Sequence, residues 1–177
     1  MLDVSVAYNR YKFVGHEFLT WLWFMIETDP DALKKADPDL SAMEIGNKMI
    51  LENSRNNADE TISISGDGAG LEEALLALKK GAKVTEINLV MRAGELEWRF
   101  SLKGESLGIS GLKCPQTGKV ESKSDIEGAV LEKLYLCGRV IDMVEKAFCM
   151  FVKLRVSPQW ETGSVRKIGS WIDASIK

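Results

Sequence analysis

Residues 84–103 read VTEINLVMRAGELEWRFSLK, and this stretch decides the fold class. Successive side chains of a strand point to opposite faces of a sheet. The second half alternates apolar and polar residues, which predicts one core face and one solvated face. Ala93-Gly94 joins the halves, and a glycine between two such runs is typical of a hairpin turn. The stretch therefore predicts an antiparallel hairpin formed by residues 84–92 and 95–103.

Two more strands are predicted before this hairpin and one after it. Residues 48–52 (KMILE) and 61–65 (TISIS) are apolar or β-branched runs, and the turn-like NSRNNADE separates them. Residues 105–115 place Leu107, Ile109 and Leu112 between glycines, and we interpret this segment as an edge strand. The sequence thus indicates an antiparallel sheet.

Helical spacing of apolar residues appears in four segments. GHEFLTWLWFMIE at 15–27 predicts a buried N-terminal helix that Asp29-Pro30 ends, and 31–42 is predicted to be a polar loop with room for one helical turn. A middle helix is expected from Leu71 to Gly81 and a short final one around Trp171. A long amphipathic helix is predicted from Ser122 to Ser157-Pro158, with its apolar stripe formed by Ile126, Val130, Leu134, Cys137, Ile141, Val144, Phe148 and Phe151.

These elements predict one α+β domain over residues 1–177. An N-terminal helix, a middle helix and a long C-terminal helix are expected to pack on the antiparallel sheet. A chain of 177 residues with 45% hydrophobic content can bury one core, and it would be cramped as two.

The bulk charge argues against a global attraction to phosphates. The formal net charge is -3, and the sequence pI is about 5.4, so nucleic-acid binding would require a local basic face. The N-terminus MLDVSVAYNRYKF has neither the basic nor the apolar region of a secretory signal. The most apolar stretch, 18–26, is too short to span a bilayer. We expect a cytoplasmic, soluble protein.

Catalytic and metal-binding chemistry finds little support in the sequence. The chain has one histidine and three cysteines, without a CxxC pair, which disfavours zinc sites, disulfide frameworks and most acid-base triads. His16 is expected at a helix start, in a capping or surface role. Cys137 and Cys149 are predicted to be buried in the long helix. We therefore expect no enzymatic activity, no metal and no cofactor.

Two weaker patterns were weighed as sites. The glycine-rich run at 66–70 lies between a strand and a helix, but it lacks the lysine and Ser/Thr of a phosphate-binding loop, so a structural turn is favoured over a nucleotide-binding enzyme. Glu95, Glu97 and Lys103 come nearest to an acidic nuclease motif. Alternation places both glutamates on the solvated face of the hairpin, where charge normally serves solubility.

A dispersed set of basic residues is the candidate contact to nucleic acid. If the sheet gathers them on one surface, they would meet a phosphate backbone without reading its sequence. An ordinary solvated surface is the alternative interpretation. The candidate DNA-binding residues are Lys79, Lys80, Lys83, Arg92, Arg99 and Lys103.

Three segments carry a resemblance to a known family. The run FVGHEFLTWLWF (13–24) resembles an FLG-x-EFLTWLW-type segment in the C-terminal half of bacterial proteins of the recombination-associated RdgC family. Two later features are similar in order and spacing: LEEALLALKKGAKVTEINLVM (71–91) before EWRFSL, and LRVSPQW (154–160) before the element I-x-x-W-I. The resemblance covers most of this chain, but only the C-terminal part of the family pattern.

The resemblance implies a DNA-associated protein without enzymatic chemistry, because members of that family bind DNA and form ring-shaped dimers around it. It implies a role in recombination or at the nucleoid, and an oligomer or a partner chain that supplies the other half. No functional residue is carried over, since the matched positions are mainly apolar or aromatic. Trp21, Trp23, Trp98 and Trp171 are expected to be core or interface anchors.

Two functions thus remain open from the sequence. The first is sequence-independent DNA association through the six basic residues. The alternative is a protein-protein interaction module, acting as an oligomer or adaptor through 18–26 or the long helix near Phe148 and Phe151. A large exposed apolar surface would favour the second.

Overall fold

The computed structural model describes residues 4–55, 58–65, 69–116, 118 and 125–174. It confirms the α+β class, with a five-stranded antiparallel sheet in the order β2-β1-β3-β4-β5. The elements in chain order are α1 (Val4–Thr28), the 3-10 helix η1 (Pro30–Lys35), β1 (Ala42–Arg55), β2 (Ala58–Ser65), α2 (Ala69–Lys79), β3 (Lys83–Ala93), β4 (Leu96–Lys103), β5 (Ile109–Lys113), α3 (Asp125–Arg155), the π-helical turn η2 (Trp160–Ser164) and α4 (Val165–Ala174).

The predicted hairpin forms the centre of the sheet. Met91 pairs with Trp98 and Leu89 with Phe100, so the apolar positions of both strands share one face. This face is buried, whereas Arg99 between these positions lies on the other face. Gly94 in the turn has φ +58, a conformation that glycine adopts without a steric penalty. Alternation in the sequence therefore indicated the core side of the sheet correctly.

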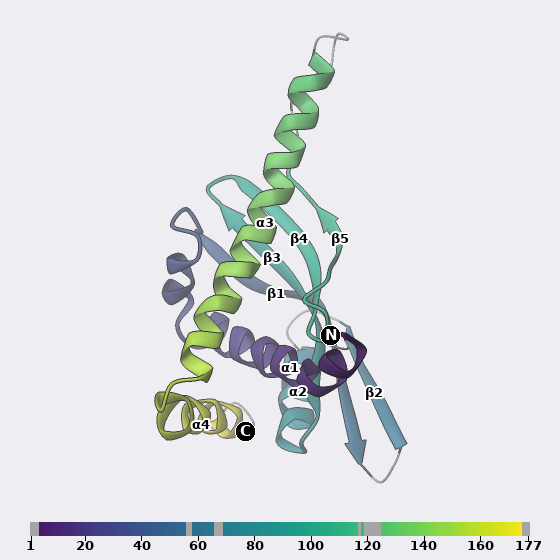
Figure 1. The fold of residues 1–177 in the computed structure, drawn as a ribbon, viewed down its shortest axis with the longest axis vertical. Coiled ribbons are helices and arrows are strands. Elements are labelled where there is room, and N and C mark those ends of the chain that lie inside the picture. The colour runs from purple at the N-terminus through teal and green to yellow at the C-terminus, as the bar shows by residue number, and fades with distance from the viewer. Residues whose placement is uncertain (1–3, 56–57, 66–68, 117, 119–124, 175–177) are drawn as a thin grey trace.

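The long helices α1 and α3 lie on one side of the central strands (Figure 1). Their contact is an aromatic cluster, in which Phe18 and Trp21 of α1 pack against Phe151 of α3 at 5.6 and 5.7 Å between ring centroids. Trp23 packs edge-on against Trp171 of α4 at 5.1 Å. The expectation that tryptophans anchor the core is met by Trp21, Trp23 and Trp98, which are all buried.

The helix α1 is longer than the sequence predicted, because it begins at Val4 rather than at Gly15. Gly15 is an internal position that lets the helix approach the end of β4, since an added Cβ would lie 1.7 Å from the carbonyl oxygen of Gly104. His16 is therefore not at a helix start and has no surface role. Its side chain is buried, with a residue exposure of 7%.

The strands β1 and β2 also extend beyond their predicted bounds. Most of NSRNNADE, which was expected to be a loop, continues the two strands, and Arg55 still pairs with Ala58. The cross-strand ladder overrides the turn-like composition here. The expected polar loop at 31–42 contains η1 and the start of β1.

The long helix α3 is confirmed, but the predicted stripe is not the face that packs on the sheet. The buried residues are Leu136, Val140, Met143, Val144, Ala147 and Phe151. Of the predicted stripe only Val144 and Phe151 are among them, while Ile126, Val130, Leu134 and Ile141 are exposed. The helix has two apolar stripes at three-four spacing, and the sequence pattern alone does not say which one meets the sheet.

The cysteines depart from the prediction as well. Cys149 is exposed, and Cys137 is only partly buried. The thiol of Cys137 on α3 lies 3.5 Å from the thiol of Cys114, which follows β5, and this contact brings the end of β5 against α3. Burial and the neighbouring Cys137 raise the pKa of the Cys114 thiol to about 11. Cys114 is therefore protonated at neutral pH and is a poor nucleophile there.

Candidate functional site

The N-terminal part of α3 projects beyond the sheet (Figure 1). We call residues 125–135 the projecting segment. All of them except Ala129 are exposed. A helix of this length is marginal in water by itself, and Gly128 weakens it further. The printed contact to this segment is a hydrogen bond from the backbone N–H of Gly118 to the carboxylate of Glu132 at 3.3 Å, so its apolar side chains remain open to water in the described structure.

Large apolar side chains are concentrated on this part of α3. The exposed ones are Ile126, Val130, Leu131, Leu134, Tyr135 and, one turn beyond the segment, Ile141. Each is at least half exposed, and Tyr135 reaches 68%. Single exposed apolar residues are common on protein surfaces, but a contiguous group of this kind marks an interaction site.

The packed part of α3 begins where the sheet first holds the helix. The indole Nε1–H of Trp98 donates a 3.0 Å hydrogen bond to the backbone carbonyl of Leu136. One helical turn further along α3, Arg139 donates from Nε and Nη2 to the two carboxylate oxygens of Asp37 at 2.9 and 3.0 Å. The Arg139 guanidinium also lies 5.4 Å from the Trp98 ring. The carboxylate of Asp37 raises the pKa of Arg139, so the guanidinium stays charged at alkaline pH.

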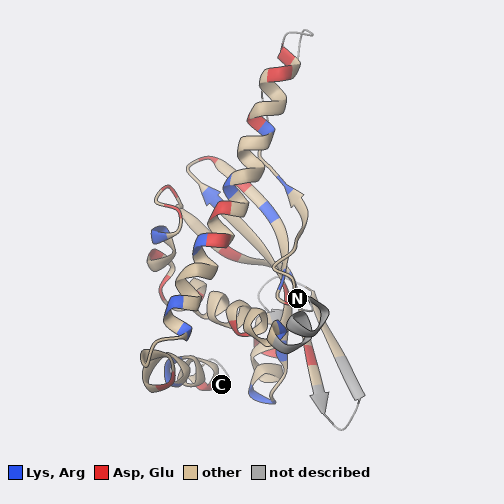
Figure 2. Cartoon of the chain, viewed as in Figure 1, with Lys and Arg blue, Asp and Glu red and all other residues tan. Residues whose placement is uncertain are grey.

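The six predicted DNA-binding residues fall into two groups instead of one surface. Lys79, Lys80 and Lys83 surround the connection from α2 to β3, and Lys79 Nζ lies 2.9 Å from the carboxylate of Asp173. Arg92, Arg99 and Lys103 lie on the sheet face that carries the polar positions of β3 and β4. Figure 2 shows basic and acidic positions interspersed along the chain.

Carboxylates neutralise part of the second group. Glu97 accepts hydrogen bonds from Arg92 at 2.9 Å and from Arg99 at 2.8 Å, and Arg92 also pairs with Glu44. These bonds lower the pKa of Glu97 and raise that of Arg92. Lys103 lies opposite Glu86 in the strand register, and the carboxylate of Glu86 lies 3.8 Å from Lys48 Nζ. As expected for the solvated face of the hairpin, Glu97 is only partly buried.

Among the side chains that the structure describes, this polar face of the sheet carries more cations than carboxylates. It holds a hollow of about 470 Å³, lined by Asn88, Arg92, Arg99 and Lys113 among others. The strand register and the ion pairs place these described side chains on it: Lys48, Arg92, Arg99, Lys103 and Lys113 against Glu44, Glu86 and Glu97. Lys48 and Lys113 were not among the six predicted residues.

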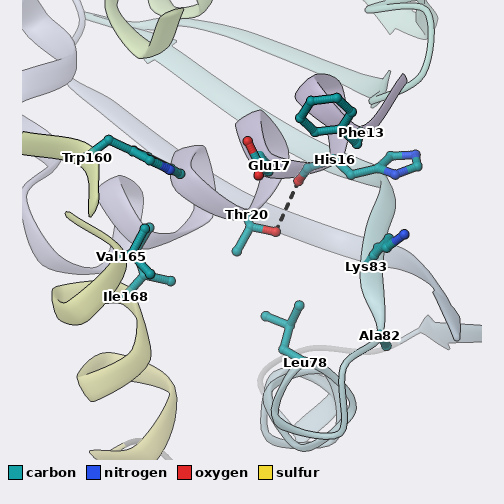
Figure 3. Close-up of a pocket in the computed structure, with 10 residues that line it drawn as sticks. All are labelled: Phe13, His16, Glu17, Thr20, Leu78, Ala82, Lys83, Trp160, Val165 and Ile168. Atoms are coloured by element: carbon teal, nitrogen blue, oxygen red, sulfur yellow. Dashed lines mark hydrogen bonds between the residues drawn. The ribbon is translucent and has the colours of Figure 1, made fainter. Parts of the chain in front are cut away.

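A separate, mainly apolar pocket of about 330 Å³ lies between α1, the end of α2 and α4 (Figure 3). His16 lines it, and neither of its ring nitrogens has a hydrogen-bond partner in the described part of the chain. Burial lowers the pKa of His16, so the imidazole is neutral at pH 7. The sequence offered no signal for this pocket, because its walls come from five elements, some of them distant along the chain.

Within the described ranges, no group of three histidine, cysteine or acidic side chains is placed to hold a metal ion. In the same residues, no helix has the length and apolar character to cross a bilayer. Residues 66–68 of the glycine-rich run lie outside the described residues, so the predicted turn there stays a prediction.

Comparison with protein-family models, curated proteins and solved structures finds no match to this chain. The resemblance to the RdgC family therefore stays a prediction from the sequence.

Proposed function

We propose that the protein is an interaction module that self-associates through α3. The observation that carries this proposal is the group of six large, exposed apolar side chains on and next to the projecting segment. Six such side chains present roughly 600 Å² per copy, and two copies together reach about 1,200 Å², the lower end of specific interfaces. A second copy is the occupant that covers this surface on both molecules at once.

The sequence of the exposed face is suited to a symmetric pair of helices. Leu131, Leu134, Gly138 and Ile141 follow one another at three-four-three spacing, and we call them the outer stripe. A Cβ placed on Gly138 would have no other atom within 4 Å, so its position is an open notch on the helix. In an antiparallel pair centred near residue 136, Leu134 of each copy lies over Gly138 of the other, and Leu131 lies over Ile141.

Two substitutions test this pairing from opposite directions. Leu134→Glu places a charge in the outer stripe, and Gly138→Leu fills the notch while favouring the helix by about 1 kcal/mol. Both variants are expected to be monomers in sedimentation equilibrium at concentrations where the parent is a dimer. Gly138→Leu should nevertheless unfold at the same temperature as the parent, or above it.

Leu76→Glu is the matched control, because Leu76 is also exposed but lies on α2. It should leave the dimer intact. A parent protein that stays monomeric up to several hundred micromolar, or a Gly138→Leu variant that still dimerises with the affinity of the parent, would overturn the proposal.

A second candidate function is sequence-independent DNA association, as the resemblance to the RdgC family implies. The observation in its favour is the excess of cations on the polar sheet face, in a protein whose net charge is negative. Phosphate contacts of this kind weaken steeply with salt. The contact would use Arg99, Lys103 and Lys113, with Lys79, Lys80 and Lys83 as a separate cluster.

Fluorescence anisotropy with a labelled duplex across a salt series tests this second candidate. Charge reversal of Arg99, Lys103 and Lys113 should abolish binding, whereas reversal of Lys79 and Lys80 should leave most of it. If the parent protein does not bind the duplex at low salt, DNA association is excluded.

A further inference from the structure

The pocket between α1, α2 and α4 has two chemically different ends. One wall is built by Trp160, Val165 and Ile168 from the C-terminal segment, and Leu78 closes the pocket from α2 (Figure 3). Lys83 and His16 lie together on the opposite side, away from α4. Ligand sites are typically apolar hollows of this size with a few polar groups that fix orientation. The pocket is suited to an elongated molecule with one polar end.

The apolar end leaves hydrocarbon surface exposed to water. Val165 at this end is among the large apolar side chains that remain exposed in the described structure, at 46%. Trp160 on the same wall is buried and packs edge-on against Phe151, at 5.5 Å between ring centroids (Figure 3). This wall is therefore fixed by the aromatic core while its outer surface faces the hollow. An apolar chain placed there would remove that surface from water.

The polar end offers one cation, Lys83, and one neutral hydrogen-bond donor, His16. Lys83 makes no ion pair within the described residues, although its neighbour Lys79 is paired with Asp173. His16 is buried without a hydrogen-bond partner, and a neutral imidazole has one N–H to donate.

Glu52 lies opposite Lys83 in the strand register, and the other nearby acceptors are already occupied. Arg155 Nε donates to the carboxylate of Glu17 at 2.6 Å, and the hydroxyl of Thr20 donates to the backbone carbonyl of His16 at 3.1 Å. Glu105 lies 3.9 Å from His16 Nε2, but it also lies 3.5 Å from Lys12 Nζ and so has a cation of its own.

We propose that this pocket binds a medium-chain monocarboxylate. Its hydrocarbon chain lies against Leu78, Val165 and Ile168, and its carboxylate lies at Lys83 and His16. A carboxylate accepts hydrogen bonds and donates none, which matches an ammonium and an imidazole N–H. The site does not depend on self-association, because α3 contributes none of the residues that line it.

The probes are octanoate and octanamide, which have the same chain length and differ in charge. Isothermal titration calorimetry of the full chain at pH 7.5 should show octanoate binding roughly tenfold more tightly than octanamide, because the charged head group adds an ionic hydrogen bond. Equal affinities, or the absence of octanoate binding at millimolar concentration, would refute the proposal.

Three variants locate the binding. Lys83→Met keeps the aliphatic stem and removes the ammonium, so octanoate should bind about as weakly as octanamide does to the parent. Lys103→Met, at the polar face of the sheet, is the matched control and should bind octanoate normally. Val165→Trp fills the apolar end from its rim and should abolish binding of both probes. If octanoate binds Lys83→Met as tightly as the parent, the assigned carboxylate position is wrong.

Discussion

The projecting segment of α3 and the part of α3 that packs on the sheet are both helical, but they differ in how far their side chains are buried. Leu134 and Leu136 are two residues apart on the same helix, yet Leu134 is 62% exposed and Leu136 only 4%. Leu136 sits where Trp98 bonds the helix backbone, whereas Leu134 belongs to the projecting segment. The helix is therefore a core element in one part and a surface in the other. Apolar spacing continues through both parts, so the projecting segment is apolar for a reason other than packing on its own sheet.

The sharpest test of this comparison exchanges each leucine for alanine. Leu136→Ala leaves a cavity against the sheet and should lower the free energy of unfolding by about 2–5 kcal/mol. Leu134→Ala should change it by less than about 0.5 kcal/mol in the monomer, because an exposed side chain loses little on truncation. Urea denaturation followed by tryptophan fluorescence measures both. Equal destabilisation by the two substitutions would show that the segment packs on its own chain.

The next largest effect is expected at the boundary between the two parts. Arg139→Met removes the guanidinium but keeps an aliphatic chain, and it leaves the largely buried carboxylate of Asp37 without its partner. We expect a loss of about 2–3 kcal/mol, somewhat below the value for a fully buried pair because both groups retain some solvent contact. Asp37→Asn in the same chain should recover part of this loss. A double-mutant cycle without coupling would show that the pair does not hold α3 at this point.

The smallest expected effect is a pH dependence of the folding stability, which arises from the buried His16. Burial lowers the pKa of His16 below its usual 6.5. The unfolded chain then binds a proton more readily than the folded one, so stability is complete above about pH 6.5 and declines as the pH falls through that value. His16 is the single histidine, and His16→Leu should remove this dependence. Denaturation midpoints between pH 5.5 and 7.5 measure it, and an unchanged slope in the variant would assign the dependence to another group.

The candidate surfaces were only partly predictable. The exposed apolar residues of α3 were recognised as apolar, but they were assigned to the core, because spacing identifies a stripe without its partner. Arg92 and Arg99 were correctly placed on the polar side of the hairpin by alternation. Their carboxylate partners include Glu44, which is 48 residues away in the sequence and becomes a neighbour only through the pairing of β1 with β3. The pocket at His16 had no sequence signal at all.

The sequence by itself determined those elements that depend only on residues close together in the chain. The alternation at 96–103, the glycine at 94 and the prolines at 30 and 158 act within a few residues, so the hairpin and the ends of α1 and α3 could be predicted. Only the tertiary structure decided which stripe of α3 is buried, how far β1 and β2 extend, and that His16 is enclosed. These depend on which surfaces meet in space, and burial is set by those contacts rather than by a residue's immediate neighbours.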